Sequence, residues 1–512
     1  MPGGLPATHT PSPTIACCGN TSFALKRSAK HFLQKVFSSC LKTAYDDGDS
    51  PNTGLPMNQQ HKRWWTLDAE QERSGADNPL SPLTPEQRRP TLPLLTLAFG
   101  WGFLVTGLLT GGALGKGLAF WPDLVVASLL GNFMNFVIGG LVGYIGYKTA
   151  CNSGLLYRFA YGNIGAFLPV LFIALLTIGW QGIVVGAFGF AWAQSIDSPM
   201  FYAIALLAGL LYTATTFFGV AALEKVSLPS VLVLVFVGVY AAWLNISQAG
   251  GWGEFLIMSA RKSAEDPLTM KGAINLVVGS WIVGAIVMAE YTRFARKAWV
   301  ALAIPFIVLI VSQWFLQIIG SMGGIVSGTY EFTTYMLQQG AVVGGLGLIA
   351  MSLALWTTGD TNLYLPAVQT ASLLRRPQKL TTVVCGLIGT ILGLGIYQYF
   401  LEWINLLASL VPPLIGPVIV DFYIVNKMQY EAGNLDRLPR WNPIAIVAYL
   451  FGAILAYASS QGHVIAGLTW MIPSLLGLLG SIAAYFVLFY GAKLAGVTFG
   501  PASLQKAQTK IR

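Results

Sequence analysis

Charged residues are scarce in this 512-residue chain, at 10% of the sequence. A soluble globular domain carries about 25% charged residues, so the chain lacks the polar surface that a water-facing protein of this size needs. Histidine is also rare, because the chain has four and three of them lie in the first 90 residues. The five cysteines show no paired metal-binding spacing. These scarcities argue against a metal centre or a histidine proton relay.

Long apolar runs stand where the charge is missing, and apolar residue types make up 54% of the chain. A helix of roughly 20 apolar residues crosses a bilayer core about 30 Å thick. Lipid forces such runs to be helical, because it offers a bare backbone no hydrogen bonds. About twelve such runs follow residue 90. The sequence therefore predicts an all-α membrane protein with about twelve transmembrane helices in contact with the lipid bilayer.

Basic residues are spread unevenly over the predicted loops. With the N-terminus placed in the cytoplasm, sixteen Lys and Arg beyond residue 90 lie in inner loops and the C-terminal tail, against four in outer loops. Cytoplasmic loops of membrane proteins are enriched in Lys and Arg. We therefore predict a multi-pass protein of the plasma (inner) membrane with both termini cytoplasmic. The same bias explains the net charge of +9 without a nucleic-acid partner.

The first 90 residues are predicted to form a cytoplasmic, mostly disordered tail, because they are rich in Pro, Ser, Thr, Gln and charge. A basic stretch at 23–44 repeats apolar residues near helical spacing. It is either a surface-lying or targeting helix or a non-functional extension upstream of a start at Met57. Residues 493–512 are predicted to form a second cytoplasmic tail.

Two glycine-rich stretches interrupt the predicted spans. One covers 106–117 in the first span, and the other covers 277–284 in the sixth. Transporters bind their cargo where helices break near the middle of the membrane, and matched breaks in two halves are typical of an inverted repeat. The alternative is that these glycines only let helices pack closely.

The eighth span carries polar side chains in an apolar run, Leu355-Trp-Thr-Thr-Gly-Asp360. Such side chains should face protein or water rather than lipid. The hydroxyls of Thr357 and Thr358 suit an alkali cation, because hard ions prefer oxygen ligands. Alternatively, both hydroxyls bond back to the preceding helical turn, with Asp360 at the membrane edge.

Trp180 lies in the middle of the third span, away from the interfacial belts where Trp is usually found. Together with Trp281 of the sixth span it could sandwich a flat heterocycle, an interaction of about 1–3 kcal/mol per stacked base. Thr177 or Gln181 could then bond the edge of the ring. The alternative is that both Trp side chains only fill space.

Ten short segments carry a resemblance to a known family: TGGALGKGL (110–118), LLGNF (129–133), GYIGYKT (143–149), LLYRFAYG (155–162), IGWQG (178–182), TTFFGVAAL (215–223), VVGSW (277–281), RFARKA (293–298), LWTTGD (355–360) and VPPLIGPVIVDFY (411–423). In this order and spacing they are similar to the nucleobase–cation symporter family, specifically its cytosine permease branch. The resemblance implies a leucine-transporter-like fold with inverted five-helix repeats at 91–249 and 271–425, followed by two additional helices at 442–492. It also implies symport with Na⁺ or H⁺ and no cofactor.

The resemblance also implies positions for both ligands. The ring would lie between Trp180 and Trp281. The cation would bind carbonyl oxygens near Gly100 and Leu104 and the hydroxyls of Thr357 and Thr358, with no further metal site.

Two ring-edge groups of cytosine permeases are absent. Thr177 stands where a Gln is frequent, and Gly359 stands where an Asn reads the pyrimidine. Such losses change substrate preference, and Gln181, Ser280 or Asn362 could replace the missing contacts. The predicted substrate contacts are Trp180, Trp281, Thr177, Gln181, Ser280, Gly359 and Asp360.

We therefore predict a monomeric symporter that imports a nucleobase or a related small planar heterocycle by alternating access. Hydroxymethylpyrimidine, hydantoin or allantoin, and creatinine-like rings remain alternative cargoes, and a membrane sensor that binds without transport is a further alternative. An enzyme is not expected, because the apolar part lacks clustered acid–base groups. A channel is not expected either, because no repeated filter sequence is visible.

Overall fold

The computed structural model describes residues 64–66, 79–218, 220–463, 467–497, 499 and 501, without the side chains of 220–228, 432 and 434. The chain divides into two compact units, and all of these residues belong to the second, His61–Arg512. The basic stretch at 23–44 and Met57 lie outside the described residues.

Helices make up the described part of the chain, in which no β-strand is found. The first half contains α3 (Thr91–Gly102), α4 (Thr106–Gly117), η1 (Phe120–Leu124), α5 (Val125–Thr149), α6 (Ser153–Tyr161), α7 (Phe167–Ala193), α8 (Pro199–Thr216) and α9 (Val220–Gln248). The second half contains α10 (Trp252–Glu265), α11 (Met270–Ile286), α12 (Ala289–Thr292), α13 (Ala298–Pro305), η2 (Phe306–Gln313), α14 (Trp314–Ser327), α15 (Phe332–Gln338), α16 (Ala341–Leu374), α17 (Gln378–Gly393), η3 (Tyr397–Tyr399), α18 (Phe400–Leu410), α19 (Pro412–Ile419) and η4 (Val420–Val425). Then follow η5 (Ala432–Arg437), α20 (Pro443–Ser460) and α21 (Pro473–Leu494).

The predicted all-α membrane fold is confirmed. Ten helices of the described residues are long and apolar enough to cross a bilayer, and the bent pair α3 and α4 forms an eleventh candidate. The shorter apolar helix α17 supplies one more, which is consistent with the predicted number of about twelve.

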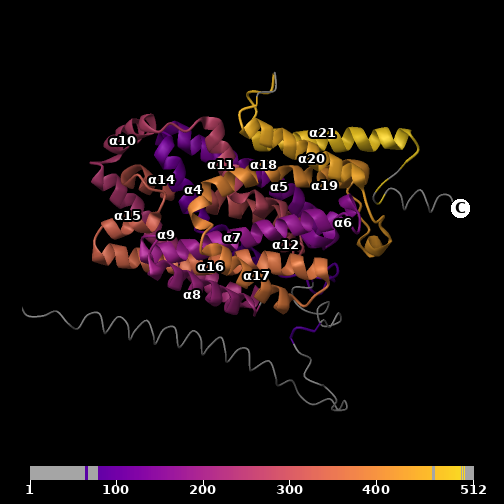
Figure 1. Cartoon of the computed structure of the whole chain (residues 1–512), viewed down its shortest axis with the longest axis horizontal. Coiled ribbons are helices and arrows are strands. Elements are labelled where there is room, and N and C mark those ends of the chain that lie inside the picture. Colours follow the sequence, from indigo (N-terminus) through magenta and orange to yellow (C-terminus); the bar gives the residue numbers. More distant parts are fainter. Residues whose placement is uncertain are drawn as a thin grey trace, which may run out of the picture. The chain divides into compact units, whose positions relative to one another are not determined.

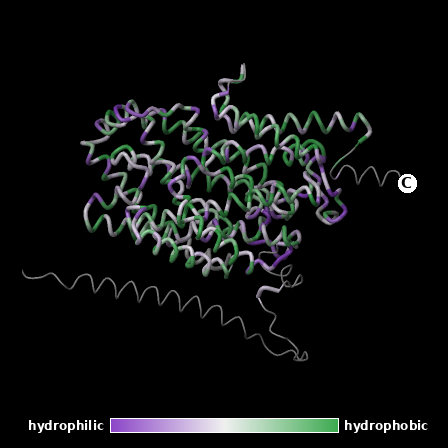
Figure 2. The backbone as a smooth tube through the Cα atoms, viewed as in Figure 1, coloured by the Kyte–Doolittle hydropathy of each residue, from purple (hydrophilic) through white to green (hydrophobic). Residues whose placement is uncertain are grey.

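The long helices lie with α8 and α17 along one margin and with α20 and α21 along the opposite one (Figure 1). The connecting helices α10 and α15 lie at one end of these long helices, and α6 lies at the other. We call these the α15 end and the α6 end. Hydrophobic residues dominate the long helices, whereas hydrophilic residues collect at α10 and beside α6 (Figure 2).

The first span is broken, but not within its glycine-rich stretch. The helices α3 and α4 meet at 43° across residues 103–105, where Phe103 has a ψ of 52°. Residues 106–117 instead form α4, so the predicted position of the break is wrong. Gly111 and Gly115 of α4 face α14, and a Cβ added at either would overlap a backbone carbonyl of that helix. A helical Gly is less favourable than Ala by about 1 kcal/mol, and close backbone packing offsets this loss.

The sixth span is also broken, at Val287 and Met288 between α11 and α12. The predicted interruption at 277–284 is wrong, because these residues are helical. Gly279 instead lets α11 approach the backbone of α18 at Ile404. Broken helices at the first and sixth spans fit an inverted repeat, and the repeats at 91–249 and 271–425 remain a prediction.

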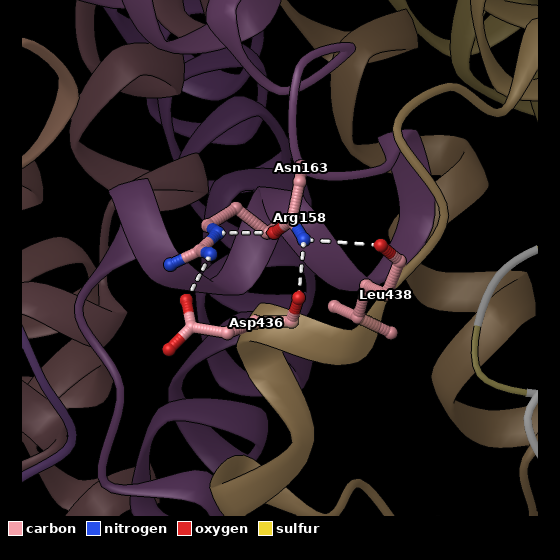
Figure 3. Close-up of polar contacts among 4 residues, drawn as sticks. All are labelled: Arg158, Asn163, Asp436 and Leu438. Atoms are coloured by element: carbon pink, nitrogen blue, oxygen red, sulfur yellow. Dashed lines mark hydrogen bonds and ion pairs between the residues drawn. The ribbon is translucent and has the colours of Figure 1, made fainter.

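At the α6 end, the connection 426–442 is tied to α6 and to the residues that follow it. Arg158 forms an ion pair with Asp436 at 3.0 Å, and its Nε donates to Oδ1 of Asn163 at 2.7 Å (Figure 3). Asn163 in turn donates from Nδ2 to the carbonyl of Leu438 at 3.0 Å. These bonds fix the entry of α7 against the connection from η4 to α20.

Residues 79–90, at the end of the predicted disordered tail, pack on the helices at the α6 end. The guanidinium of Arg88 donates to the carbonyls of Ala295 at 2.8 Å and Tyr147 at 2.9 Å. The next amide, that of Arg89, donates to the carbonyl of Phe294 at 2.9 Å. The residues that lead into α3 are therefore bonded to α5 and to the connection between α12 and α13.

Candidate functional site

A small cavity lies beside the break in the first span. Four elements line it: the broken span, α7, α11 and α16. Its lining residues are Trp101, Leu104, Thr106, Thr177, Trp180, Ser280, Trp281, Val283, Gly284, Asn362 and Leu365. The cavity offers about 30 Å³ to water-sized molecules, far less than the roughly 300–1,000 Å³ of typical ligand pockets. A flat heterocycle therefore needs the lining side chains to move apart before it fits.

Two predicted residues, Trp180 on α7 and Trp281 on α11, meet at this cavity and are both buried. The ring of Trp180 lies edge-on to Phe400, with centroids 6.2 Å apart. The ring of Trp281 lies edge-on to Trp101, with centroids 5.2 Å apart. The two indoles thus come from different helices to one space, and their role as a sandwich remains a prediction.

Trp101 was missed by the sequence analysis. It lies at the end of α3, stacks on Tyr291 of α12 at 3.9 Å between centroids, and is buried. These two aromatic rings therefore join the two broken spans just beside the cavity. Trp101 lies between Gly100 and Gly102, in a span that was already predicted to be broken. This position was the sequence signal that could have identified it.

The polar groups of the cavity differ in whether they are free to bind a ligand. The hydroxyl of Thr177 donates to the carbonyl of Ile173 at 2.9 Å, and that of Ser280 donates to the carbonyl of Val277 at 2.8 Å. The amide of Asn362 forms no hydrogen bond with any described residue, and its side chain lines the cavity. Asn362 therefore has both donor and acceptor capacity to offer a ring edge.

Two predicted cation ligands, Leu104 and Thr358, lie at the break. The hydroxyl oxygen of Thr358 accepts from the amide of Val105 at 3.2 Å and donates to the carbonyl of Ala354 at 2.7 Å. The carbonyl of Leu104 is in the unwound residues that line the cavity. These oxygens are of the type that an alkali cation prefers. No cluster of His, Cys, Asp or Glu suited to a metal ion is present in the described part.

The other two predicted cation ligands, Thr357 and Gly100, belong to α16 and α3. The hydroxyl of Thr357 donates to the carbonyl of Ala354 at 3.0 Å, within its own helix. Gly100 is buried inside α3, before the unwound residues. Both remain predictions as ligands.

Comparison with known proteins identifies the chain. Residues 82–488 match a family described as permeases for cytosine/purines, uracil, thiamine and allantoin. The chain belongs to this permease family. The resemblance to nucleobase–cation symporters is thereby confirmed, and the chain is a transporter rather than an enzyme.

Curated relatives of the permease cover most of its length. It is 31% identical to the cytosine permease of Escherichia coli O157:H7 over 409 residues, which span 80% of this chain and 93% of the relative. It is 24% identical to a purine-uracil permease of Arabidopsis thaliana, over 82% of this chain and 76% of the relative. A hydantoin permease of Microbacterium maritypicum is 22% identical, over 79% and 86%.

Solved structures confirm the fold of the permease. Mhp1, a nucleobase-cation-symport-1 family transporter in a closed conformation with bromovinylhydantoin bound, superposes with a TM-score of 0.68. The two are 18% identical, and the match covers 81% of this chain and 95% of Mhp1. A Na⁺-coupled sialic acid symporter superposes with a TM-score of 0.58 at 13% identity, over 78% and 89%. The leucine-transporter-like fold class is therefore confirmed.

Two predicted substrate contacts of the permease do not line the cavity. Gln181 is fully buried against α17 at Gly389, and neither its Oε1 nor its Nε2 has a hydrogen-bond partner in the described part. At Gly359 an added Cβ would overlap the ring of Tyr212, which reaches in from α8. Tyr212 therefore fills the space that a side chain at position 359 would occupy.

Asp360 is also absent from the cavity lining. Its carboxylate is buried and accepts hydrogen bonds from the hydroxyls of Thr215 and Thr216 of α8. The indole of Trp356 donates to the same Thr215 hydroxyl at 3.3 Å. The Asp360 side chain thus lies inside the protein, where α16 packs on α8.

Proposed function

We propose that this permease is a secondary active symporter, which imports a nucleobase or a related small planar heterocycle with Na⁺ or H⁺ by alternating access. The observation that carries the proposal is the meeting of Trp180, Trp281 and the first-span break at one buried cavity. Aromatic faces on two helices suit a flat ring, and a broken helix beside them suits a coupling ion. The family match supports this class of cargo.

For substrate binding, we propose that the indoles of Trp180 and Trp281 stack on the ring while Asn362 bonds its edge. Cytosine permeases bond the ring with an Asn at the position that corresponds to Gly359. In this chain the ring of Tyr212 fills the space beside Gly359, and Asn362 supplies the ring-edge bond instead. Thr177 and Ser280 shape the cavity, since their hydroxyls already bond within their own helices.

For the coupling ion, we propose Na⁺ bound by the Leu104 carbonyl and the Thr358 hydroxyl, with the Gly100 carbonyl and Thr357 completing the ligands. An ion at this place would pull the two ends of the break and α16 together. Binding of cation and cargo next to each other couples their free energies reciprocally.

We further propose a monomer in the plasma membrane, with the α6 end in the cytoplasm and the α15 end outside. Basic residues support this orientation, because Arg158, Arg293 and Arg296 all lie in or next to the elements at the α6 end.

The deciding experiment is uptake into proteoliposomes of radiolabelled cytosine, adenine, uracil, hydantoin and hydroxymethylpyrimidine, with and without a Na⁺ gradient. We expect one ring to accumulate and Trp180→Ala and Trp281→Ala each to abolish saturable uptake. Trp243→Ala is the matched control, because Trp243 is 59% exposed on α9. Normal transport by both cavity variants would refute the sandwich. Binding without counterflow would identify a sensor instead of a transporter.

A further inference from the structure

The connection between α14 and α15 reaches an aromatic residue that contacts Trp180 of the cavity. The ring of Tyr330 stacks on Phe400 with centroids 5.9 Å apart, and Phe400 lies edge-on to Trp180. The backbone of Tyr330 also packs against α4, where a Cβ added at Gly112 would lie 2.7 Å from the Tyr330 Cα. We call residues 329–338 the lid.

Glu331 is the residue of the lid whose setting is unusual. Its side chain is 7% exposed, and its Oε1 accepts a hydrogen bond from the hydroxyl of Tyr397. Tyr397 is itself buried and packs against Phe190 and Gly186 of α7. This one hydrogen bond therefore joins the lid to η3, directly before α18, and through Tyr397 to α7, the helix that carries Trp180.

No Lys or Arg of the described residues forms an ion pair with Glu331. The titratable groups near the lid come from the lid itself and from the elements packed on it: Tyr330, Tyr335, Tyr397 of η3, Glu402 of α18, Tyr240 of α9 and Lys116 of α4. Lys116 lines an outer cavity together with Tyr330 and Asp266. Lys116, Asp266 and Glu402 are exposed to solvent. A buried carboxylate with hydroxyl neighbours is costly to keep charged, and burial raises the pKa of Glu331 to about 7, against the hydrogen bond from Tyr397, which lowers it.

We propose that Glu331 is a proton-binding site of the lid, so that closing the lid over the cavity takes up one proton from the outer solution. With the lid open, Glu331 is solvated and charged at neutral pH. With the lid closed, the carboxyl is buried and holds a proton at a pH below about 7, and it remains bonded to Tyr397. The site acts on access to the cavity, and it is separate from the proposed Na⁺ ligands at Leu104 and Thr358.

The pH window follows from the two states. An open-lid pKa near the ordinary value of 4.5 and a closed-lid pKa of about 7 mean that the closed form is most favoured below the lower value. Its advantage then falls about tenfold per pH unit between the two values. Above the higher value both forms are charged, and the equilibrium no longer changes. Raising the pH from 5.5 to 8 should therefore increase the open fraction about 25-fold while that fraction is small.

The test measures access to the cavity without any cargo. Val283→Cys places a thiol in the cavity, in a chain whose five natural Cys are replaced by Ala. Intact cells are labelled from outside with a membrane-impermeant thiol reagent between pH 5.5 and 8.5. Gly253→Cys on α10 is the reference thiol, because a Cβ there has no neighbour within 4 Å. It corrects for thiol ionisation and establishes that the α15 end is outside.

We expect corrected labelling of the Val283→Cys thiol to rise about 25-fold from pH 5.5 to a plateau near pH 8. Glu331→Gln should remove this rise and leave labelling slow at every pH, because a neutral side chain imitates the protonated form. Tyr397→Phe should move the midpoint to higher pH, since it removes the bond that stabilises the charged form. Glu402→Gln, a nearby exposed carboxylate, should keep the wild-type profile.

An unchanged pH profile in Glu331→Gln would overturn the proposal, and so would a flat profile in the unaltered lid. If Glu331→Gln does not reach the membrane, the Tyr397→Phe midpoint decides, and an unshifted midpoint overturns the proposal. The inference rests on entry through this cavity, as proposed above. The proton-site proposal and the proposed function can fail separately, because thiol labelling requires no cargo and the uptake experiment requires no introduced thiol.

Discussion

The hydroxyl oxygen of Thr358 accepts a hydrogen bond from the backbone amide of Val105 at 3.2 Å. A side chain of α16 thus reaches the unwound residues of the first span, 253 positions earlier in the chain. This contact places a hydroxyl of α16 at the peptide that joins Leu104 and Val105, the region in which the coupling ion is proposed to bind.

Thr358→Val should weaken the cation dependence of uptake. The substitution removes a hydroxyl ligand and a hydrogen bond to the break while it keeps the side-chain shape. Hydrogen bonds that involve a charged group are worth about 1.5–3 kcal/mol, so the Na⁺ concentration for half-maximal uptake should rise roughly 10- to 100-fold. Thr361→Val is the control, because the Thr361 hydroxyl donates to the carbonyl of Thr357 in its own helix. Equal effects of both variants in a Na⁺ titration would contradict the assignment.

Asn362→Leu should reduce affinity for the transported ring and relax discrimination among ring edges. The amide of Asn362 lines the cavity. A site that selects its substrate by bonding a polar ring edge loses affinity and selectivity when the bonding group is removed. We expect the KM to rise roughly 5- to 150-fold, since a lost hydrogen bond with an unsatisfied partner costs about 1–3 kcal/mol. Competition by unlabelled heterocycles measures this. Thr177→Val should differ little from the wild type, because its hydroxyl bonds Ile173, and a reversed order would argue against Asn362.

Gly359→Asn alone should destabilise the protein rather than restore a cytosine permease. The new side chain would collide with the ring of Tyr212, and overpacking a core typically costs about 1–3 kcal/mol. Combining it with Tyr212→Leu should recover thermal stability, because the second change vacates the space. Thermal unfolding of the purified single and double variants measures the coupling. Additive effects of the two substitutions would show that their side chains do not compete.

Gly111→Leu should separate α4 from α14 and prevent folding of the broken span. A Cβ at Gly111 would overlap the backbone of Gln317, so even Ala is expected to lose thermal stability. Gly345→Ala in α16 is the control, because an added Cβ there meets nothing within 4 Å and Ala favours a helix by about 1 kcal/mol over Gly. A Gly111→Ala protein as stable as Gly345→Ala would show that this packing is looser than the structure indicates.

The sequence predicts the class of fold because apolar runs long enough to cross a bilayer leave few structures open. It also pointed to Trp180 and Trp281 as partners, and both line the same cavity. The signal was a Trp in mid-span, away from the membrane interface where Trp is usually found. The predicted positions of the breaks are wrong because glycine density does not separate unwinding from close packing. Gly111 and Gly279 are helical, and the true breaks at 103–105 and 287–288 carry no glycine.

Side-chain direction was the other limit of sequence reasoning. Asp360 and Asn362 are two positions apart on α16, and helical neighbours at this spacing do not share a face. Only Asn362 lines the cavity, whereas Asp360 bonds Thr215 of α8. The role of Tyr212 at Gly359 could not be foreseen either, because it depends on a ring from another helix.

The bonds of Arg88 have a consequence for release of cargo. If α3 swings away from α5 and α12 to let cargo out at the α6 end, the guanidinium has to leave the carbonyls of Tyr147 and Ala295. The hydrogen bond from the Arg296 guanidinium to the Arg88 carbonyl, 2.9 Å long, has to break as well. In such a movement, a residue in front of the first helix would add to the barrier to release, although it lies far along the chain from the proposed cargo contacts Trp180, Trp281 and Asn362.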